Sequence, residues 1–308
     1  MNDDRRKINI RIAVAAAGIC LFAGLLIWGT SADRSISDTL YSDNNLFCYV
    51  MALIGPMPVF FVTVPLAGAL LQRSLGSGFG KGVKLLLTII AAALVIGLSF
   101  YGAKAFTSSD CLDSIYPSAK NNMALIIPII VCVFIPLGFL GLRLAAKNTD
   151  TLLVKRIVMV LIAICFAYAA QEILKGMMRR PRYRTAIKGY EGVGFVNWYE
   201  KFPYTKELPA ALGIAKDEFA SFPSGHSMMS MTSFIGLPAL AMIVPAFRGK
   251  EVPLALCGFG YSCIVMFSRI LAGAHYLSDV AASGLIMLTV SAVYMLILKT
   301  TVKADLSR

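Results

Sequence analysis

Histidine chemistry in this chain is confined to two positions, because His226 and His275 are its only histidines. Near neutral pH an imidazole can act as a nucleophile, a general acid or a general base. Asp279 follows His275 by four residues, a spacing that places both side chains on one face of a helix. If Asp279 accepts a hydrogen bond from one ring nitrogen, the other nitrogen presents a lone pair to an electrophile. We therefore expect His275 to be a nucleophile that Asp279 orients, although an isolated pair of this kind more often caps a helix or lies at a lipid interface.

The residues around His226 suit an anionic ligand. His226 follows Pro-Ser-Gly at 223–225, where Ser224 is a good N-cap and a helix start directs backbone N–H groups at an anion. Gly225 leaves room for the backbone to approach phosphate oxygens. The preceding stretch is basic, with Lys175, Arg179, Arg180, Arg182, Arg184, Lys188, Lys201, Lys206 and Lys216. Such cations bind phosphate, but they could equally contact lipid headgroups or solvent.

The composition indicates that membrane-spanning helices carry these residues. Of the 308 residues, 57% are hydrophobic and only 15% are charged. A soluble domain carries about 25% charged residues, which argues against an ordinary cytosolic fold. Disorder is excluded because no segment combines low hydrophobicity with high charge. A helical span takes about 17 to 25 apolar residues. The segments that qualify are 12–29, 46–71, 85–103, 123–142, 157–174, 227–247, 252–268 and 280–298. We predict an all-α, polytopic transmembrane helix bundle of about eight spans.

The positions of the cations predict the orientation. Lys and Arg precede the first expected span and follow the second, fourth, sixth and eighth. Because cytoplasmic loops are enriched in these residues, we expect both termini in the cytoplasm, in a bacterial cytoplasmic membrane or its equivalent. Segment 30–45, which contains Asp33, is then an outward loop, and both histidines and the basic stretch reach the same outer rim. This convergence favours a catalytic site over two isolated interfacial histidines.

These segments resemble the signature of the type 2 phosphatidic acid phosphatase superfamily, which also includes vanadium haloperoxidases. The family pattern consists of K-x6-R-P, P-S-G-H and S-R-x5-H-x3-D. The second part matches at 223–226, and the third matches at Ser268, Arg269, His275 and Asp279.

The first part of the pattern departs from the family. Lys175 with six intervening residues leads to Arg182, but Tyr183 stands where the pattern has proline. Arg180-Pro181 is an arginine-proline pair in another register. The spacing assigns the family role to Arg182, with Arg180 as its competitor.

The resemblance implies metal-independent phosphate ester hydrolysis through a phosphohistidine, with no cofactor. His275 would attack phosphorus, while His226 would protonate the leaving oxygen and then activate water. The non-bridging oxygens would be bound by Lys175, Arg182, Ser224, Gly225 and Arg269. The resemblance also implies a six-helix core over 81–308, with the active-site loop at 175–226 and two extra spans in 1–80.

We therefore expect an integral membrane phosphatase for a phosphorylated lipid, either phosphatidic-acid-like or a polyprenyl diphosphate such as undecaprenyl diphosphate. Its expected partners are the bilayer and that lipid, with no nucleic acid. The aromatic loop before Pro223, with a short helix at 207–219, would be a lid for lipids or an ordinary packed loop. The alternatives are a lipid phosphotransferase that uses the same histidine, a non-catalytic phospholipid-binding or transport protein, and a vanadate-dependent haloperoxidase.

Overall fold

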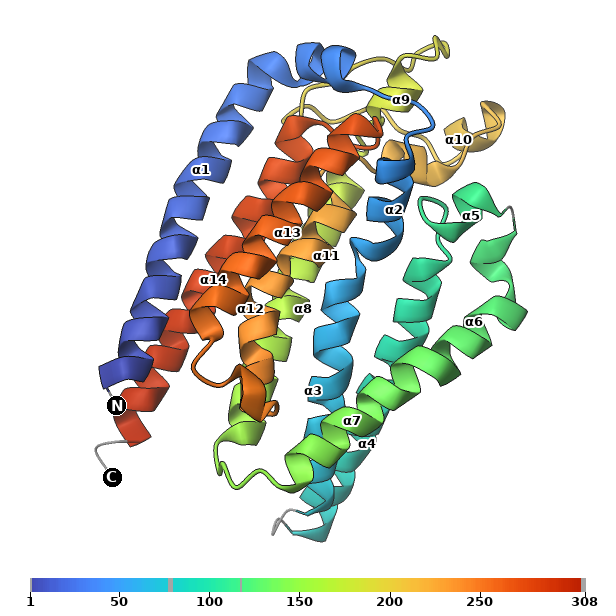
Figure 1. Ribbon diagram of the computed structural model, residues 1–308. Helices are drawn as coiled ribbons and strands as arrows, with labels where there is room; N and C mark the ends of the chain where they lie inside the picture. Colours follow the sequence, from blue (N-terminus) through green and yellow to red (C-terminus); the bar gives the residue numbers. More distant parts are fainter. Residues whose placement is uncertain (1, 77–79, 117, 306–308) are drawn as a thin grey trace. The chain divides into compact units, whose positions relative to one another are not determined.

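The computed structural model describes residues 2–76, 80–116 and 118–305, and every regular element in this part of the chain is a helix (Figure 1). The chain divides into two compact units. The first unit combines the chain up to Ala52 with Ala163–Met231 and the chain from Gly260 onward. The second unit combines Leu53–Ile162 with Thr232–Phe259.

The longer elements alternate with short turns of helix. In chain order the elements are α1 (Asn2–Leu40), α2 (Leu46–Ile54), α3 (Met57–Leu75), α4 (Lys81–Phe106), α5 (Leu112–Ile115), η1 (Ala119–Asn121), α6 (Met123–Ile129), η2 (Ile130–Phe134), α7 (Ile135–Ala146), α8 (Leu153–Met178), α9 (Tyr183–Ala186), α10 (Leu208–Ala211), η3 (Lys216–Phe219), α11 (Gly225–Met231), α12 (Ser233–Ala239), η4 (Leu240–Met242), η5 (Pro245–Phe247), α13 (Glu251–Leu271) and α14 (Leu277–Asp305).

The predicted polytopic bundle is confirmed, with one difference in the sixth expected span. Seven helical stretches in the described part of the chain are long and apolar enough to cross a membrane: Arg5–Leu40, Leu46–Leu75, Lys81–Phe106, Met123–Ala146, Leu153–Ala186, Glu251–Leu271 and Leu277–Thr300. The remaining segment, 227–247, is helical but broken into α11, α12, η4 and η5. Pro238 within α12 has no N–H to donate, which contributes to this fragmentation. The segment's side chains are nonetheless mostly buried, including Met231 and Phe234.

In the second unit, apolar helices contain prolines and pack closely at glycines. Pro65 lies inside α3 and Pro128 inside α6, so neither proline ends its helix in a loop. Glycines let these helices approach closely: a Cβ on Gly68 would lie 2.0 Å from the carbonyl oxygen of Gly138. Close backbone contact of this kind is how membrane helices gain packing energy where lipid tails are as apolar as side chains.

In the first unit, α1 runs along α14 (Figure 1). A Cβ on Gly284 would lie 2.8 Å from the ring of Phe22, so the two helices are in close contact at this point. The prediction of a loop at 30–45 is wrong for most of that segment, because α1 continues to Leu40. Asp33 is only 1% exposed, and its carboxylate pairs with the buried guanidinium of Arg180 at 2.8 Å. The first helix therefore delivers a carboxylate into the interior of this unit.

The loop between α9 and α11 has a small core of its own. Val193, Phe202 and Phe219 are buried together, and the rings of Phe202 and Phe219 stack with centroids 5.5 Å apart. The helix expected at 207–219 forms as two pieces, α10 and η3. Gly213 between them has a φ of +65°, a left-handed conformation that ends a helical turn.

Candidate active site

The basic segment begins at the last turn of α8. Lys175 Nζ lies 3.7 Å from Glu172 Oε1, a salt bridge between residues three positions apart on α8. Arg179 has a φ of +51°, and this left-handed residue ends the helix. The chain then turns so that the guanidinium of Arg180 lies inside the unit and is completely buried.

Helix α11 begins at the residues expected for an anion site. The Ser224 carbonyl accepts the Met228 N–H at 3.1 Å, and the Ser227 hydroxyl contacts the Ser224 hydroxyl at 2.9 Å. The Ser224 N–H donates to the carbonyl of Asp279 at 3.1 Å, and Ser283 Oγ donates to the Ser224 carbonyl at 2.8 Å. The Pro-Ser-Gly-His segment is therefore bonded to α14, the helix that carries Asp279.

His226 is the second residue of α11 and is partly exposed.

Lys175 and Gly225 meet at this helix start. A Cβ on Gly225 would lie 3.3 Å from Lys175 Nζ and 3.7 Å from Gln171 Nε2. The first and second parts of the motif are thus adjacent in space, although they are fifty residues apart in the chain. A Cβ on Gly225 would require the Lys175 ammonium group to move by a few tenths of an ångström.

The turn between α13 and α14 explains the spacing of the third motif. The carbonyl of Arg269 accepts both the Ala274 and the His275 N–H groups, each at 3.2 Å. Gly273 has a φ of +59°, and a Cβ there would lie 2.8 Å from the ring of Tyr41. The Arg269 side chain is buried, with Nη2 donating to the Cys48 carbonyl at 2.7 Å. Arginine and histidine are therefore joined by backbone bonds across a tight turn.

His275 is held by a backbone carbonyl. Its Nδ1 lies 2.7 Å from the Ser221 carbonyl oxygen, which can only accept, so Nδ1 carries the proton and Nε2 presents the lone pair. Asp279 Oδ2 lies 3.8 Å from the same nitrogen, within ion-pair range but beyond normal hydrogen-bond length. The partner expected for this nitrogen was Asp279, and the closer one is Ser221. Asp279 Oδ2 instead accepts the Ser221 hydroxyl at 2.5 Å and the Tyr276 N–H at 2.8 Å.

The surroundings of His275 favour the neutral ring. Its pKa is lowered to about 4, chiefly because burial disfavours the charged form. Asp279 opposes this shift, whereas the positive charges of Arg182 and Lys175 add to it. Near neutral pH the ring is therefore uncharged, and Nε2 keeps the lone pair that a nucleophile needs.

The two competing arginines have different environments. Arg180 donates from Nη1 to Asp279 Oδ1 at 2.6 Å, from Nη2 to Asp33 Oδ2 at 2.8 Å and from Nε to the Val196 carbonyl at 2.7 Å. Arg182 makes a longer contact, 3.5 Å from Nη1 to Glu218 Oε1, and its charge reaches His275. Arg180 is thus fully occupied by protein groups.

Glu218 anchors the cations after α8. It accepts Arg184 Nη2 at 2.5 Å and Nε at 3.1 Å, and it also accepts the Thr185 hydroxyl. Burial alone would raise its pKa, but the bonds from Arg184 and the charges of Arg182 and Arg184 outweigh burial and lower it. Glu218 is therefore ionised near neutral pH and fixes the segment that follows Arg180.

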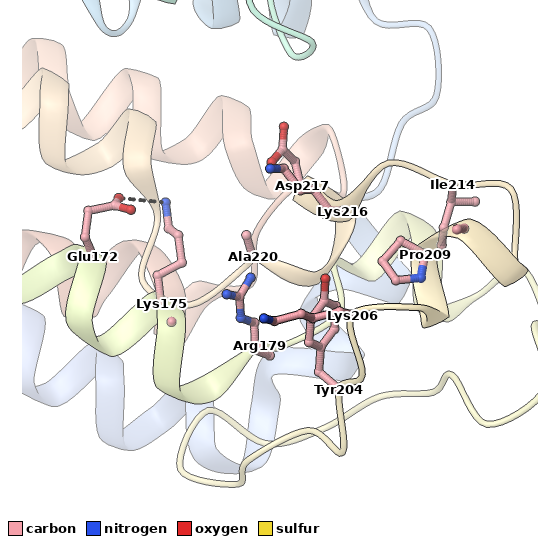
Figure 2. A pocket seen from close by; sticks show the side chains of 12 residues that line it. Glu172, Lys175, Arg179, Tyr204, Lys206, Pro209, Ile214, Lys216, Asp217 and Ala220 are labelled. Atoms are coloured by element: carbon pink, nitrogen blue, oxygen red, sulfur yellow. Dashed lines mark ion pairs between the residues drawn. The ribbon is translucent and has the colours of Figure 1, made fainter.

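An open cavity of about 720 Å³ adjoins Lys175 (Figure 2). Its cationic lining consists of Lys175, Arg179, Lys206 and Lys216, and Glu172 and Asp217 are its acids. Arg179 stacks on Tyr204, with 4.9 Å from Cζ to the ring centroid. Within the residues that the structure describes, no group of three or more His, Cys, Asp and Glu side chains is arranged to hold a metal ion.

Sequence reasoning missed Asp33, Ser221 and Glu218. Ser221 and Glu218 had no recognisable spacing to the motifs. Asp33 carried one usable signal, an ionisable residue one helical turn beyond the predicted end of an apolar span. Such residues at membrane depth are rare and usually functional.

Comparison with known proteins adds a family to this geometry. Residues 156–303 match the family model of the PAP2 superfamily. The match contains every residue predicted for the site and excludes α1. Searches of curated proteins and of solved structures found no match.

We expect the imidazole of His275 to titrate near pH 4, well below the ordinary value, because it is buried beside two cations. Labelling of the two histidines for NMR in detergent micelles measures this directly, and His226→Gln identifies the remaining signal. Arg182→Gln should raise the pKa of His275, because it removes a positive charge. Titration near 6.5 in the native protein would contradict this environment.

Arg180→Gln should destabilise the protein far more than Arg182→Gln. It leaves the buried carboxylates of Asp33 and Asp279 without their shared cation, a loss of about 3–5 kcal/mol. Arg182→Gln removes a longer contact, 3.5 Å to Glu218, and Glu218 keeps its ion pair with Arg184 at 2.5 Å. Thermal unfolding of both variants in the same detergent is the measurement, and equal shifts in Tm would contradict the assignment.

Proposed function

Because the chain belongs, through residues 156–303, to the PAP2 superfamily, we propose that it is a membrane phosphatase that hydrolyses a lipid phosphate ester or diphosphate. The observation that carries this proposal is His275, a buried and neutral imidazole with Nδ1 fixed by Ser221. Its free nitrogen lies among cations that attract a phosphate group. An interfacial histidine with a purely structural role needs neither feature.

The proposed reaction has two steps. Nε2 of His275 attacks phosphorus, the P–N bond forms as the ester P–O bond breaks, and His226 donates a proton to the leaving oxygen. His226 then takes a proton from water, which attacks the phosphohistidine, breaks the P–N bond and releases inorganic phosphate. The ring gains positive charge in the first step, and Asp279 at 3.8 Å stabilises that charge.

Cations supply most of the remaining transition-state stabilisation. We assign Lys175, Arg182, Ser224, Gly225 and Arg269 to the non-bridging oxygens. Positioning plus fixed positive charge is most of what phosphoryl transfer requires. Arg182 is preferred over Arg180 because Arg180 is fully buried between two carboxylates, whereas the charge of Arg182 acts on His275.

The lipid substrate is supported by the membrane helices and by the cavity beside Lys175. The cationic side of the cavity suits a phosphate headgroup, and Pro209 and Ile214 offer apolar contact for the lipid portion. We propose a multi-pass protein of a bacterial cytoplasmic membrane with both termini in the cytoplasm and the site facing outward. Residues 81–308 would form the phosphatase core, and residues 1–80 would add two spans, the first of which contributes Asp33.

His275→Ala should reduce phosphate release by at least ~10³-fold, the scale of removing a catalytic nucleophile. The assay offers phosphatidic acid, phosphatidylglycerol phosphate and undecaprenyl diphosphate in EDTA. Lys188→Gln is the matched control, an exposed cation of the same loop that does not line the cavity. Activity that survives His275→Ala, or that EDTA abolishes, would refute the proposal.

His226→Ala should separate the two steps when the substrate is p-nitrophenyl phosphate. Its leaving group needs no proton, so phosphohistidine should form normally but hydrolyse slowly for want of a base. We expect a burst of p-nitrophenolate close to one per protein, followed by a slow steady rate. An equal slowing of burst and steady rate would show that His226 does not act in the second step.

A further inference from the structure

We infer that Asp33, on the first membrane helix and outside the region that matches the family, is a positioning residue for His275 that acts through Arg180 and Asp279. The inference rests on the proposed function, because it concerns the rate at which His275 reacts.

Both carboxylate oxygens of Asp33 are used inside the protein. Oδ2 accepts Arg180 Nη2 at 2.8 Å, and Oδ1 accepts the Ser278 N–H at 2.9 Å. The Ser278 hydroxyl also donates to Oδ2. Asp33 thus binds the residue that precedes Asp279 as well as the arginine that pairs with Asp279.

Arg180 joins the two carboxylates. Its Nη1 donates to Asp279 Oδ1 at 2.6 Å and to Ser278 Oγ at 2.8 Å, opposite its contact with Asp33. Its guanidinium also lies 4.0 Å from the ring centroid of Tyr276. With all three side chains at most 1% exposed, bulk water can screen these charges only weakly.

The charges of this cluster do not cancel. Two carboxylates and one guanidinium sum to −1, and the excess lies beside His275, 3.8 Å from Asp279 Oδ2 to Nδ1. When His275 attacks phosphorus its ring becomes positive, and a fixed negative charge nearby stabilises that state. If residue 33 carried no charge, the positive charge of Arg180 would balance the negative charge of Asp279, and the net charge of the cluster would be zero. Asp33 should therefore accelerate formation of phosphohistidine without contributing to phosphate binding.

The approach of α1 to this cluster depends on Gly29. A Cβ on Gly29 would lie 2.8 Å from Asp33 Oδ1 and 2.9 Å from Ser278 Cβ. Gly24 on the same helix has no atom within 4 Å of the corresponding position. Alanine at 29 therefore displaces Asp33 without a change of charge, and alanine at 24 controls for the loss of a glycine.

The main test compares Asp33→Asn with Asp38→Asn in the full-length protein. Asparagine keeps the shape of Asp33 but removes its charge, and Asp38 lies on the same helix, accepting the Tyr183 hydroxyl at 2.7 Å. Two quantities are measured. The first is the single-turnover rate of phosphohistidine formation, normalised to the concentration of protein that binds phosphate. The second is the Kd for inorganic phosphate. We expect Asp33→Asn to slow the chemical step about 10-fold or more with an unchanged Kd. Asp38→Asn should change neither quantity.

A native rate in Asp33→Asn, or a Kd that weakens in proportion to the rate, would overturn the inference. If Asp33→Asn does not fold, the comparison of Gly29→Ala with Gly24→Ala decides: a slower chemical step confined to Gly29→Ala supports the inference, and equal rates overturn it. Absence of activity in the native protein, or activity that survives His275→Ala, would instead refute the proposed function.

Discussion

A completely buried arginine between two carboxylates is the constraint on which the rest of this site depends. Removing Arg180, Asp33 and Asp279 from water carries a large desolvation penalty, which only close and complementary bonds can offset. The cluster therefore fixes the segment after α8, the C-terminal part of α1 and the start of α14 relative to one another within one unit. Asp279 in turn accepts Ser221 Oγ, and the carbonyl of Ser221 holds His275. The orientation of the imidazole is thus set by a chain of bonds that begins on α1.

The same site sets two electrostatic demands against each other. The positive charges of Lys175 and Arg182 attract an anion. They also lower the pKa of His275, which favours the neutral ring. Asp279 acts in the opposite direction and favours the positive ring. Under the proposed mechanism, a bound phosphate group offsets the cations, so the influence of Asp279 on the ring grows as the reaction begins. The surroundings then favour a neutral ring before binding and a charged ring during attack.

Local spacing predicted much of this site, and long-range contacts account for what it did not. The helix start at Gly225 follows from capping, and the structure places it as expected. The prediction that His275 and Asp279 share a helix face is wrong, because His275 lies in the turn before α14 and Asp279 Oδ2 is 3.8 Å from its ring. The contacts of Asp33 with Arg180 and of Ser221 with His275 join residues 147 and 54 positions apart, which no periodicity encodes. The broken sixth segment was missed for a related reason. Hydropathy indicates that a segment is apolar but not whether its helix is continuous. A fragmented apolar helix therefore has the same hydropathy as a continuous span.

The departure at Tyr183 can be understood from the backbone. Arg182 has φ −70° and ψ 152°, the extended conformation that a residue before proline adopts, and Tyr183 is the first residue of α9, where proline is favoured. A proline would fit the backbone here, so the register that places Arg182 in the family role agrees with the local geometry. Tyr183 adds what proline cannot: its hydroxyl donates to Asp38 at 2.7 Å, and its ring meets Tyr41 edge-on with centroids 5.4 Å apart. Asp38 and Tyr41 belong to the C-terminal end of α1 and the residue after it. Tyr183 therefore lacks the fixed φ of proline but adds a second set of contacts with α1. The first is the buried ion pair between Arg180 and Asp33.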